Sequence, residues 1–298
     1  MAIIDRVAST PRAAVEEIHI RRPGVYVSLV VNRRQRVARV VDFLAGNFLQ
    51  KMQAIDAAAL KEGIERVYTL VEREESLGWL KVGYAREGSI PAYYKRSDAY
   101  MMGHLVSANP PLTEEGIPEA PVADTGRAEK TLVAAKKLAA ELSAPRGVRA
   151  EVVDDVVAAI RWSSAKAKRP AWLDERFGRT GTRFHISAKP AKAGAKGSEQ
   201  VVSIELQETF GNAYLQPAVA PAKPEDAAFL RAALESAGDD LDAREVTCVF
   251  ALSPAENVHA AAAFLAAGYK KTGLLAKHFA GDKRRLDALL WTRRPAGA

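Results

Sequence analysis

Hydrophobic and polar positions alternate in short runs along the first third of the chain. Val25–Val31 and Val37–Leu44 are rich in β-branched residues and are separated by a polar turn, which is typical of a strand hairpin. Met52–Gly63 carries helix-forming residues and ends on a glycine suited to a C-terminal cap. Val67–Val71 predicts a short buried strand, and Leu77–Val82 a brief helix.

The last third shows a comparable pattern. Thr182–Ala188 and Val201–Gln207 predict paired strands, and Pro224–Ala237 predicts a helix with proline in its first turn, where a missing N–H costs little. Glu245–Leu252 reads as a strand, and Asn257–Ala267 as an alanine-rich helix. Strands and helices therefore alternate, as in a mixed α/β (α+β) protein.

Two further helices are expected ahead of these elements. Ala128–Leu142 places leucines at helical spacing, and Val152–Trp162 has an amphipathic pattern. Before them, residues 104–127 are rich in proline, which predicts a stiff linker.

One phrase occurs twice. Gly83–Gly88 and Gly268–Gly273 each begin with a Gly-Tyr pair after a predicted helix and place a second glycine five residues later. Each is followed by an Asp-Ala pair, at Asp98 and at Asp287, which opens an apolar strand. A repeated unit of this kind predicts two related domains in tandem.

The predicted organisation follows from this repeat. We expect a truncated N-terminal unit at 1–103, the linker at 104–127 and a more complete unit at 128–298. Each unit should hold a mixed, mostly antiparallel central sheet flanked by helices, with the front helices missing from the first. A chain of 298 residues is long enough for two such cores.

Composition narrows the function classes. Apolar residues make up 48% and charged residues 27%, which is globular composition, and Cys248 is the sole cysteine, so no disulfide forms within the chain. No stretch approaches the roughly 18 apolar residues of a membrane span, and the N-terminus lacks a signal peptide, so we expect a cytoplasmic protein. The net charge of +7 suits an anionic partner or simply a basic soluble protein.

The second copy of the phrase resembles the GNAT superfamily of acyl-CoA-dependent N-acyltransferases. In that family the last helix begins with Asn, has a small residue three positions on and a Tyr four before a Gly, and is followed by an aromatic residue. Asn257, Ala260, Gly268 and Tyr269 match this pattern, and Phe264 replaces the Tyr.

The first copy resembles the family less closely. It matches from Gly83 onward, with Trp79 at the Tyr position and Glu72 where Asn is expected. The resemblance spans most of 128–294 in element order, and 18–103 more weakly.

The resemblance implies a site for acetyl-CoA or another acyl-CoA. The family holds the pantetheine arm of the cofactor between two splayed parallel strands, here expected around Gly211–Ala220 and Val246–Leu252. Its pyrophosphate rests on free N–H groups at the start of the next helix. The implied cofactor-binding residues are Ala218, Val219, Ala220, Asn257 and Phe264.

Parts of that site are missing. The family's glycine-containing phosphate loop is absent from Val219–Asp226, where two prolines remove N–H donors and two carboxylates follow, and from Gln50–Asp56. Phe264 also has no proton to give to a leaving thiolate.

Glu205 and Glu208 are the candidate catalytic residues, because a carboxylate on or beside the central strand could accept the proton of an attacking amine. Alternation along a half-exposed strand explains Glu205 equally well, and Asn257 is a good helix N-cap as well as a cofactor contact. His185, His259 and His278 have no metal-ligand spacing, so no metal is predicted.

Three functions stay open. The first is transfer of an acyl group to an amine on a small molecule or a protein, and the second is an inactive GNAT fold kept for binding or scaffolding. The third, nucleic-acid binding through Arg33–Arg36 and Lys283–Arg285, is less favoured than two solvated turns. Pairing of the two units within one chain and pairing in a homodimer both stay open, and no membrane partner is expected.

Overall fold

The computed structural model describes residues 3–4, 13–143, 148–162, 173, 175–178, 181–190 and 198–294. The chain divides into two compact units. Unit 1 comprises Met1–Ser89, Asp98–Ala123 and Leu275–Asp287; unit 2 comprises Ile90–Ser97, Asp124–Leu274 and Ala288–Ala298. Each unit thus takes in a segment from the other part of the sequence, whereas the predicted domains are contiguous. The boundaries at 103 and 128 stay predictions.

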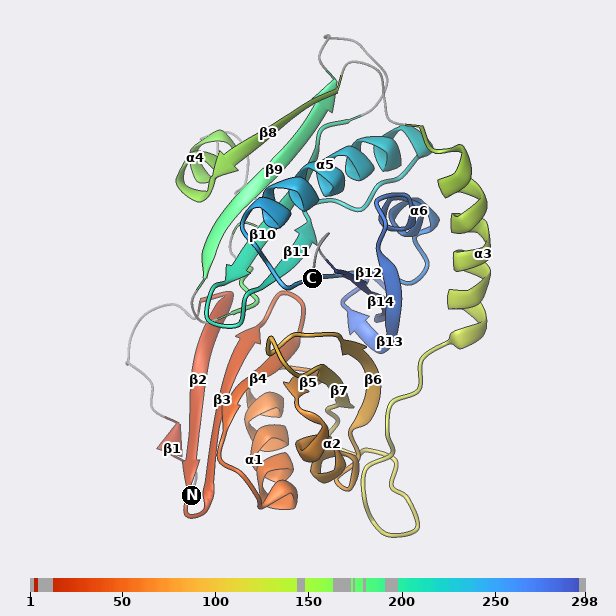
Figure 1. Ribbon diagram of the computed structural model, residues 1–298. Helices are drawn as coiled ribbons and strands as arrows, with labels where there is room; N and C mark the ends of the chain where they lie inside the picture. Colours follow the sequence, from red (N-terminus) through yellow and green to blue (C-terminus); the bar gives the residue numbers. More distant parts are fainter. Residues whose placement is uncertain are drawn as a thin grey trace. The chain divides into compact units, whose positions relative to one another are not determined.

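Unit 1 is a sheet with two helices (Figure 1). Its strands follow the order β1-β2-β3-β4-β5-β7-β6, in which β4 and β5 are parallel and the pairs β2–β3, β3–β4 and β5–β7 are antiparallel. Its elements are β1 (Ile3–Ile4), β2 (Val15–Arg22), β3 (Val25–Asn32), β4 (Val37–Phe43), α1 (Phe48–Lys61), β5 (Arg66–Val71), α2 (Arg73–Leu80), β6 (Ala85–Ile90) and β7 (Ala99–Leu105).

The core of unit 1 forms because α1 turns one apolar stripe toward the sheet. Met52, Ile55 and Ala59 of α1 are buried with the inward residues of β3 and β5. Each buried side chain of this size contributes roughly 1.5–3 kcal/mol. The helix ends at Lys61 with Glu62 as its C-cap, and Gly63 follows with a φ of 68°, the left-handed conformation that glycine adopts without a Cβ clash.

Unit 2 is larger. Its strands follow the order β13-β14-β12-β11-β10-β9-β8, with β11 and β12 parallel and the neighbouring pairs β12–β14, β10–β11, β9–β10 and β8–β9 antiparallel. Its elements are α3 (Thr125–Glu141), β8 (Val148–Asp154), α4 (Asp155–Arg161), β9 (Thr182–Pro190), β10 (Gln200–Gln207), β11 (Asn212–Pro217), α5 (Pro224–Ala243), β12 (Cys248–Pro254), α6 (Val258–Ala266), β13 (Lys270–Phe279) and β14 (Leu286–Arg293). Residues 275–279 of β13 and 286–287 of β14 belong to unit 1. The predicted mixed, mostly antiparallel sheet flanked by helices is confirmed.

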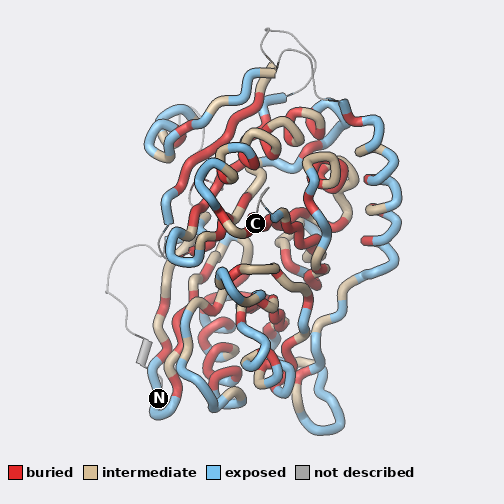
Figure 2. The backbone as a smooth tube through the Cα atoms, viewed as in Figure 1, coloured by how far each residue is buried: buried red, intermediate tan, exposed pale blue. Residues whose placement is uncertain are grey.

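Two long helices enclose the core of unit 2. Leu230, Leu234 and Leu241 of α5 are buried, and α5 packs against β9 and β10. Ala260–Ala263 of α6 are all buried, because small side chains let α6 approach α3 and α5 closely. Figure 2 shows the outer face of α3 as largely exposed, so α3 covers the core with one face only.

One predicted helix is wrong in part. Residues 152–154 end a strand, β8, and only Asp155–Arg161 are helical. The strand pairs with β9 at one edge of the sheet, and the Asp154 carboxylate accepts the N–H of Val156 at 2.8 Å, which begins α4. Val152 and Val153 lie at helical spacing from Val156 and Val157 of α4, so the end of the strand and the helix share one apolar pattern in the sequence.

The two units share their strand registers. The parallel pair runs from Val37–Arg66 to Val40–Thr69 in unit 1, and from Asn212–Cys248 to Leu215–Ala251 in unit 2. Positive φ angles also recur, at Gly83 and Gly268 and, nine residues later, at Ala92 and Lys277. These correspondences agree with the repeat in the sequence, and a common origin for the two units stays a proposal.

We expect Gly103→Ala to destabilise unit 1. A Cβ at Gly103 would lie 2.1 Å from a carboxylate oxygen of Glu87, beside the buried guanidinium of Arg66, so the ion pair between those side chains must shift. Overpacking of this kind costs about 1–3 kcal/mol. Denaturant unfolding measures the loss, with Gly126→Ala as the control, since its Cβ meets no atom closer than 3.7 Å. Equal stability of the two variants would contradict this packing.

Candidate functional site

The sheet of unit 2 opens between β11 and β12. Their parallel pairing ends at Leu215–Ala251, yet both strands continue. Beyond that point β11 stays with β10, through Val202–Pro217 and a bond from the Ala218 N–H to the Val201 carbonyl. β12 stays with β14 as far as Pro254–Ala288. Residues 216–220 and 252–254 therefore flank a gap in the hydrogen-bonded sheet, here called the strand opening.

Small residues line one side of the strand opening. Ala218 is half-buried, and Val219 and Ala220 are exposed, so the three predicted cofactor contacts on this strand lie together at its end. An extended ligand with amide groups could pair with such strand edges as a further strand does.

Asn257 lies where the opening meets α6. Its side-chain oxygen accepts the N–H of Ala260 at 2.8 Å, which caps the helix, and its amide donates to the Pro221 carbonyl at 3.1 Å. Asn257 thus ties the segment after β11 to the helix after β12. The N-cap interpretation of this residue is confirmed, whereas its contact with a cofactor stays a prediction, and its side-chain oxygen and nitrogen already bond Ala260 and Pro221.

Phe264 lies in the core of unit 2, and its role in cofactor binding stays a prediction. It is fully buried, stacked on Trp291 with ring centroids 5.4 Å apart and edge-on to Tyr269 at 5.2 Å. Its contacts are those of a core residue, and its ring offers no proton for catalysis.

The start of α5 does not suit a diphosphate. Lys223 is the N-cap without a side-chain cap bond, and Pro224 follows with no N–H. Glu225 and Asp226 complete the first turn, and the buried Asp226 carboxylate accepts both the N–H and the hydroxyl of Ser198, at 3.0 and 2.7 Å. These carboxylates occupy the end of the helix dipole that anions favour.

The two candidate carboxylates differ in their surroundings. Glu205 is buried and accepts the N–H groups of Phe177, at 2.8 Å, and Gly178, as well as the Gln207 amide at 2.6 Å. Glu208 is exposed and accepts the Thr182 hydroxyl at 2.8 Å, beside a shallow cavity of about 230 Å³. The contacts of Glu205 hold the segment at 175–178 against the sheet.

Aromatic rings cover the closed end of the parallel pair. Tyr214 of β11 and Phe250 of β12 are paired across the strands, with ring centroids 5.3 Å apart. Phe177 stacks on Tyr214 at 4.4 Å, and Tyr93 packs edge-on to Phe250 at 5.6 Å. Sequence reasoning missed this group, because its members are separated by up to 157 residues and no spacing connects them.

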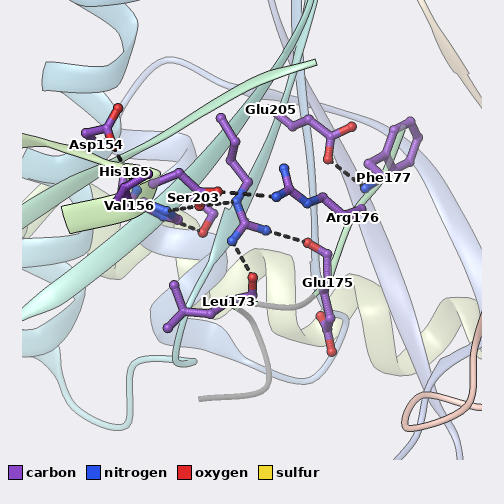
Figure 3. Close-up of polar contacts among 11 residues, drawn as sticks. Asp154, Val156, Leu173, Glu175, Arg176, Phe177, His185, Ser203 and Glu205 are labelled. Carbon is purple, nitrogen blue, oxygen red and sulfur yellow. Dashed lines mark hydrogen bonds and ion pairs between the residues drawn. The ribbon is translucent and has the colours of Figure 1, made fainter. Parts of the chain in front are cut away.

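A buried polar network lies on β9 and β10 (Figure 3). Asp155 accepts bonds from Arg183 at 2.7 Å and His185 at 3.0 Å, and His185 also bonds the hydroxyl of Ser203 at 2.8 Å. Burial lowers the pKa of His185, so the ring is neutral near pH 7. Partial burial alone would raise the pKa of Asp155, but the bonds from His185 and Arg183 outweigh it and the pKa is lowered.

The network joins α4 to the sheet beneath it. Arg183 also donates to the backbone carbonyls of Leu173 and Glu175. One guanidinium therefore links α4, through Asp155, to the backbone just ahead of the Phe177 and Gly178 N–H groups that bond Glu205. Ser203 and His185 are both buried, so this hydroxyl lacks the exposure that a nucleophile needs to reach a substrate. We read the network as structural support for this face.

The equivalent gap in unit 1 is filled. β4 and β5 also part after four pairs, but Lys51 of α1 turns inward and donates to the Leu44 carbonyl at 2.5 Å. Its ammonium lies 4.6 Å from the ring centroid of Phe43, 4.2 Å from Phe48 and 5.7 Å from Trp79. Cation–π attraction thus holds the Lys51 side chain against the ring of Phe43, and Ala218 takes the place of Phe43 in unit 2.

Both basic loops lie in unit 1 and are largely neutralised. Arg33 pairs with Glu62 at 2.5 Å and Glu16 at 2.8 Å. Arg36 and Arg285 both pair with Glu65, the latter at 3.2 Å. Cations engaged in this way have less charge to offer to phosphates.

The described residues offer neither a metal-ion site nor a membrane-spanning helix. No group of three or more His, Cys, Asp or Glu side chains in the described ranges is placed to hold a metal ion. None of the helices built from those residues is both long and apolar enough to cross a membrane.

No protein-family model and no curated protein matches the sequence. Solved structures similar to the chain include a ribosomal-protein alanine N-acetyltransferase from Escherichia coli, at 16% identity, covering 50% of this chain and 96% of that one, with a TM-score of 0.35. A spermidine/spermine N-acetyltransferase from Vibrio cholerae has 14% identity, 50% and 92% coverage and a TM-score of 0.37. A Vibrio cholerae spermidine N-acetyltransferase in complex with CoA and spermine has 16% identity, 38% and 65% coverage and a TM-score of 0.31.

These three solved structures are N-acetyltransferases, and each aligns with half of this chain or less. Similarities this low give no information about the site, so what is said of the site comes from contacts within this chain.

We expect the stability of unit 1 to depend on pH through Lys51. Burial lowers the pKa of this ammonium to about 8, although the charge of Glu75 opposes the shift. The folded state then releases the proton before the unfolded chain does, so the contribution of Lys51 to stability rises between pH 8 and 10.5. The melting temperature of wild type minus that of Lys51→Met should be larger at pH 9.5 than at pH 7.5.

The exposed Lys61 on the same helix provides the control, as Lys61→Met. A wild-type advantage that shrinks with rising pH would contradict the burial of Lys51.

We expect Asn257→Ala to lower the free energy of unfolding by about 1 kcal/mol, the usual cost of a lost N-cap. Asn257→Asp keeps the acceptor for Ala260 but removes the donor to Pro221, so its stability should lie between alanine and wild type. Denaturant unfolding of the three proteins measures this order. An alanine variant as stable as wild type would show that the tie is not formed.

Proposed function

We propose that unit 2 binds the pantetheine arm of an acyl thioester in the strand opening and that the protein transfers the acyl group to an amine. The donor used by the family that the sequence resembles is acetyl-CoA or another acyl-CoA. The observation that carries the proposal is the parting of β11 and β12 after Leu215–Ala251. Transfer of an acyl group to an amine is also the reaction class of the N-acetyltransferases to which the chain is similar.

The parts of the site fit the donor unequally. The strand edges and the small residues Ala218–Ala220 fit an uncharged extended arm. The start of α5 does not fit a diphosphate, because Pro224 lacks an N–H and two carboxylates follow it. When bound, the thioester would supply the activated carbonyl that the amine attacks.

The chain's own residues have the following roles in the proposal. Asn257 holds the segment at Pro221 against α6 and so keeps the mouth of the opening in place. Glu205 and Glu208 are the groups proposed to accept the proton of the amine. The three bonds to Glu205 favour a positioning role for it, whereas Glu208 is exposed and accepts one bond, from Thr182.

A second candidate is a catalytically inactive module that retains the fold for binding or scaffolding. It is favoured by Asn257, whose polar atoms are both engaged within the protein, and by the buried Phe264. Its amine or protein partner, and any homodimer, would then use another surface.

We expect Ala218→Phe to abolish binding of the arm, since unit 1 shows that an aromatic ring at the matching strand end, Phe43, fills its gap. Saturation-transfer NMR with S-acetyl-pantetheine and with acetyl-CoA measures contact between arm and protein. Wild type should give signals from the arm of at least one of the two.

Ala134→Phe, at an exposed position on α3, is the matched control and should behave as wild type. No signal from either ligand at millimolar concentration would remove the acyltransferase proposal and leave the inactive module.

A further inference from the structure

We propose that the acyl donor enters the strand opening on a pantetheine arm that carries no adenosine diphosphate. The arm would be either phosphopantetheine attached to a carrier protein or a small pantetheine thioester. This inference rests on the proposed function and concerns the chemical class of its donor.

The backbone at the mouth of the opening is poor in donors. Pro217, Pro221 and Pro224 follow one another within eight residues, and none of them has an N–H. The N–H of Ala218 is bonded to the Val201 carbonyl, and the N–H of Ala227 to the carbonyl of Lys223. A diphosphate is held by several converging backbone N–H groups; three prolines remove such groups from this segment, and the bonds of Ala218 and Ala227 engage two more.

Charge at the same place opposes a nucleotide. Glu225 is exposed in the first turn of α5, and Asp226 is held in that turn by two bonds from Ser198. A diphosphate carries two or more negative charges, so its approach to these carboxylates is unfavourable. Lys223, an exposed residue at the start of α5, carries one positive charge. That charge balances the single negative charge of a phosphodiester but not the several negative charges of a nucleotide.

The segment is also prevented from rearranging easily. Pro221 is buried and its carbonyl accepts the Asn257 amide, while Asp226 anchors the helix start to Ser198. The strand edges ahead of it keep their capacity to bond amides, and Ala218–Ala220 present small uncharged side chains. The site thus selects for a neutral arm and against a polyanionic end.

Calorimetric titration or NMR line broadening with three donors tests this inference. The donors are acetyl-CoA, S-acetyl-pantetheine and an acetylated phosphopantetheine carrier protein. In wild type, S-acetyl-pantetheine should bind at least as tightly as acetyl-CoA. Glu225→Gln should tighten acetyl-CoA about tenfold, because one repulsive charge is removed, and should change S-acetyl-pantetheine less than twofold.

Asp239→Asn, an exposed position near the other end of α5, is the control and should change neither affinity. Tighter binding of the carrier protein than of S-acetyl-pantetheine identifies a protein-borne arm, and equal or weaker binding identifies a small thioester. Acetyl-CoA binding tenfold or more tightly than S-acetyl-pantetheine in wild type overturns the inference alone. Absence of binding by all three donors overturns the proposed function with it.

Discussion

The site depends on one constraint of β-sheet hydrogen bonding. A strand can bond neighbours on both of its sides only while both run alongside it. Here β11 follows β10 and β12 follows β14, and these two pairs diverge. β11 is held by β10 and β12 by β14, so their shared pairing stops at Leu215–Ala251 and leaves two strand edges without a mutual partner. Backbone groups in that position need another partner, either water or a ligand.

The two units satisfy this constraint in different ways. In unit 1 the side chains of Phe43, Phe48, Trp79 and Lys51 occupy the gap, and the Lys51 ammonium bonds a backbone carbonyl there. Unit 2 has Ala218 in place of an aromatic residue at the end of the corresponding strand. We therefore place the proposed ligand site in unit 2, where the sequence also has the more complete family pattern around Asn257.

Much of the fold could be predicted from local patterns. The β-branched runs, the proline at the start of α5 and the Asn257 cap are decided by residues within a few positions of one another, and the structure places them as expected. The end of strand β8 could not be recognised, because Val152 and Val153 continue the helical spacing of the apolar residues of α4. Local spacing also gave no sign that Leu275–Asp287 belongs to unit 1.

The chemistry of the site was less predictable than its position. The sequence identifies Glu205 as a carboxylate on a central strand, but its bonds to Phe177 and Gly178 depend on a segment that reaches it across 27 or 28 residues. Asp155 and His185 likewise meet only through the pairing of β8 with β9. Such contacts are set by strand register, which a single sequence does not determine where both faces of the strand are buried.

Hydrogen–deuterium exchange of unit 2 tests the opening of the sheet most directly. The Ala218 N–H, which bonds the Val201 carbonyl, should be protected with or without ligand. The amides of 219 and 220, and those of 252–253 that do not bond β14, should exchange readily without ligand and become protected when S-acetyl-pantetheine is added. Slow exchange of these amides in the free protein, with no change on addition of the thioester, would mean that the strands are closed and that the gap holds nothing.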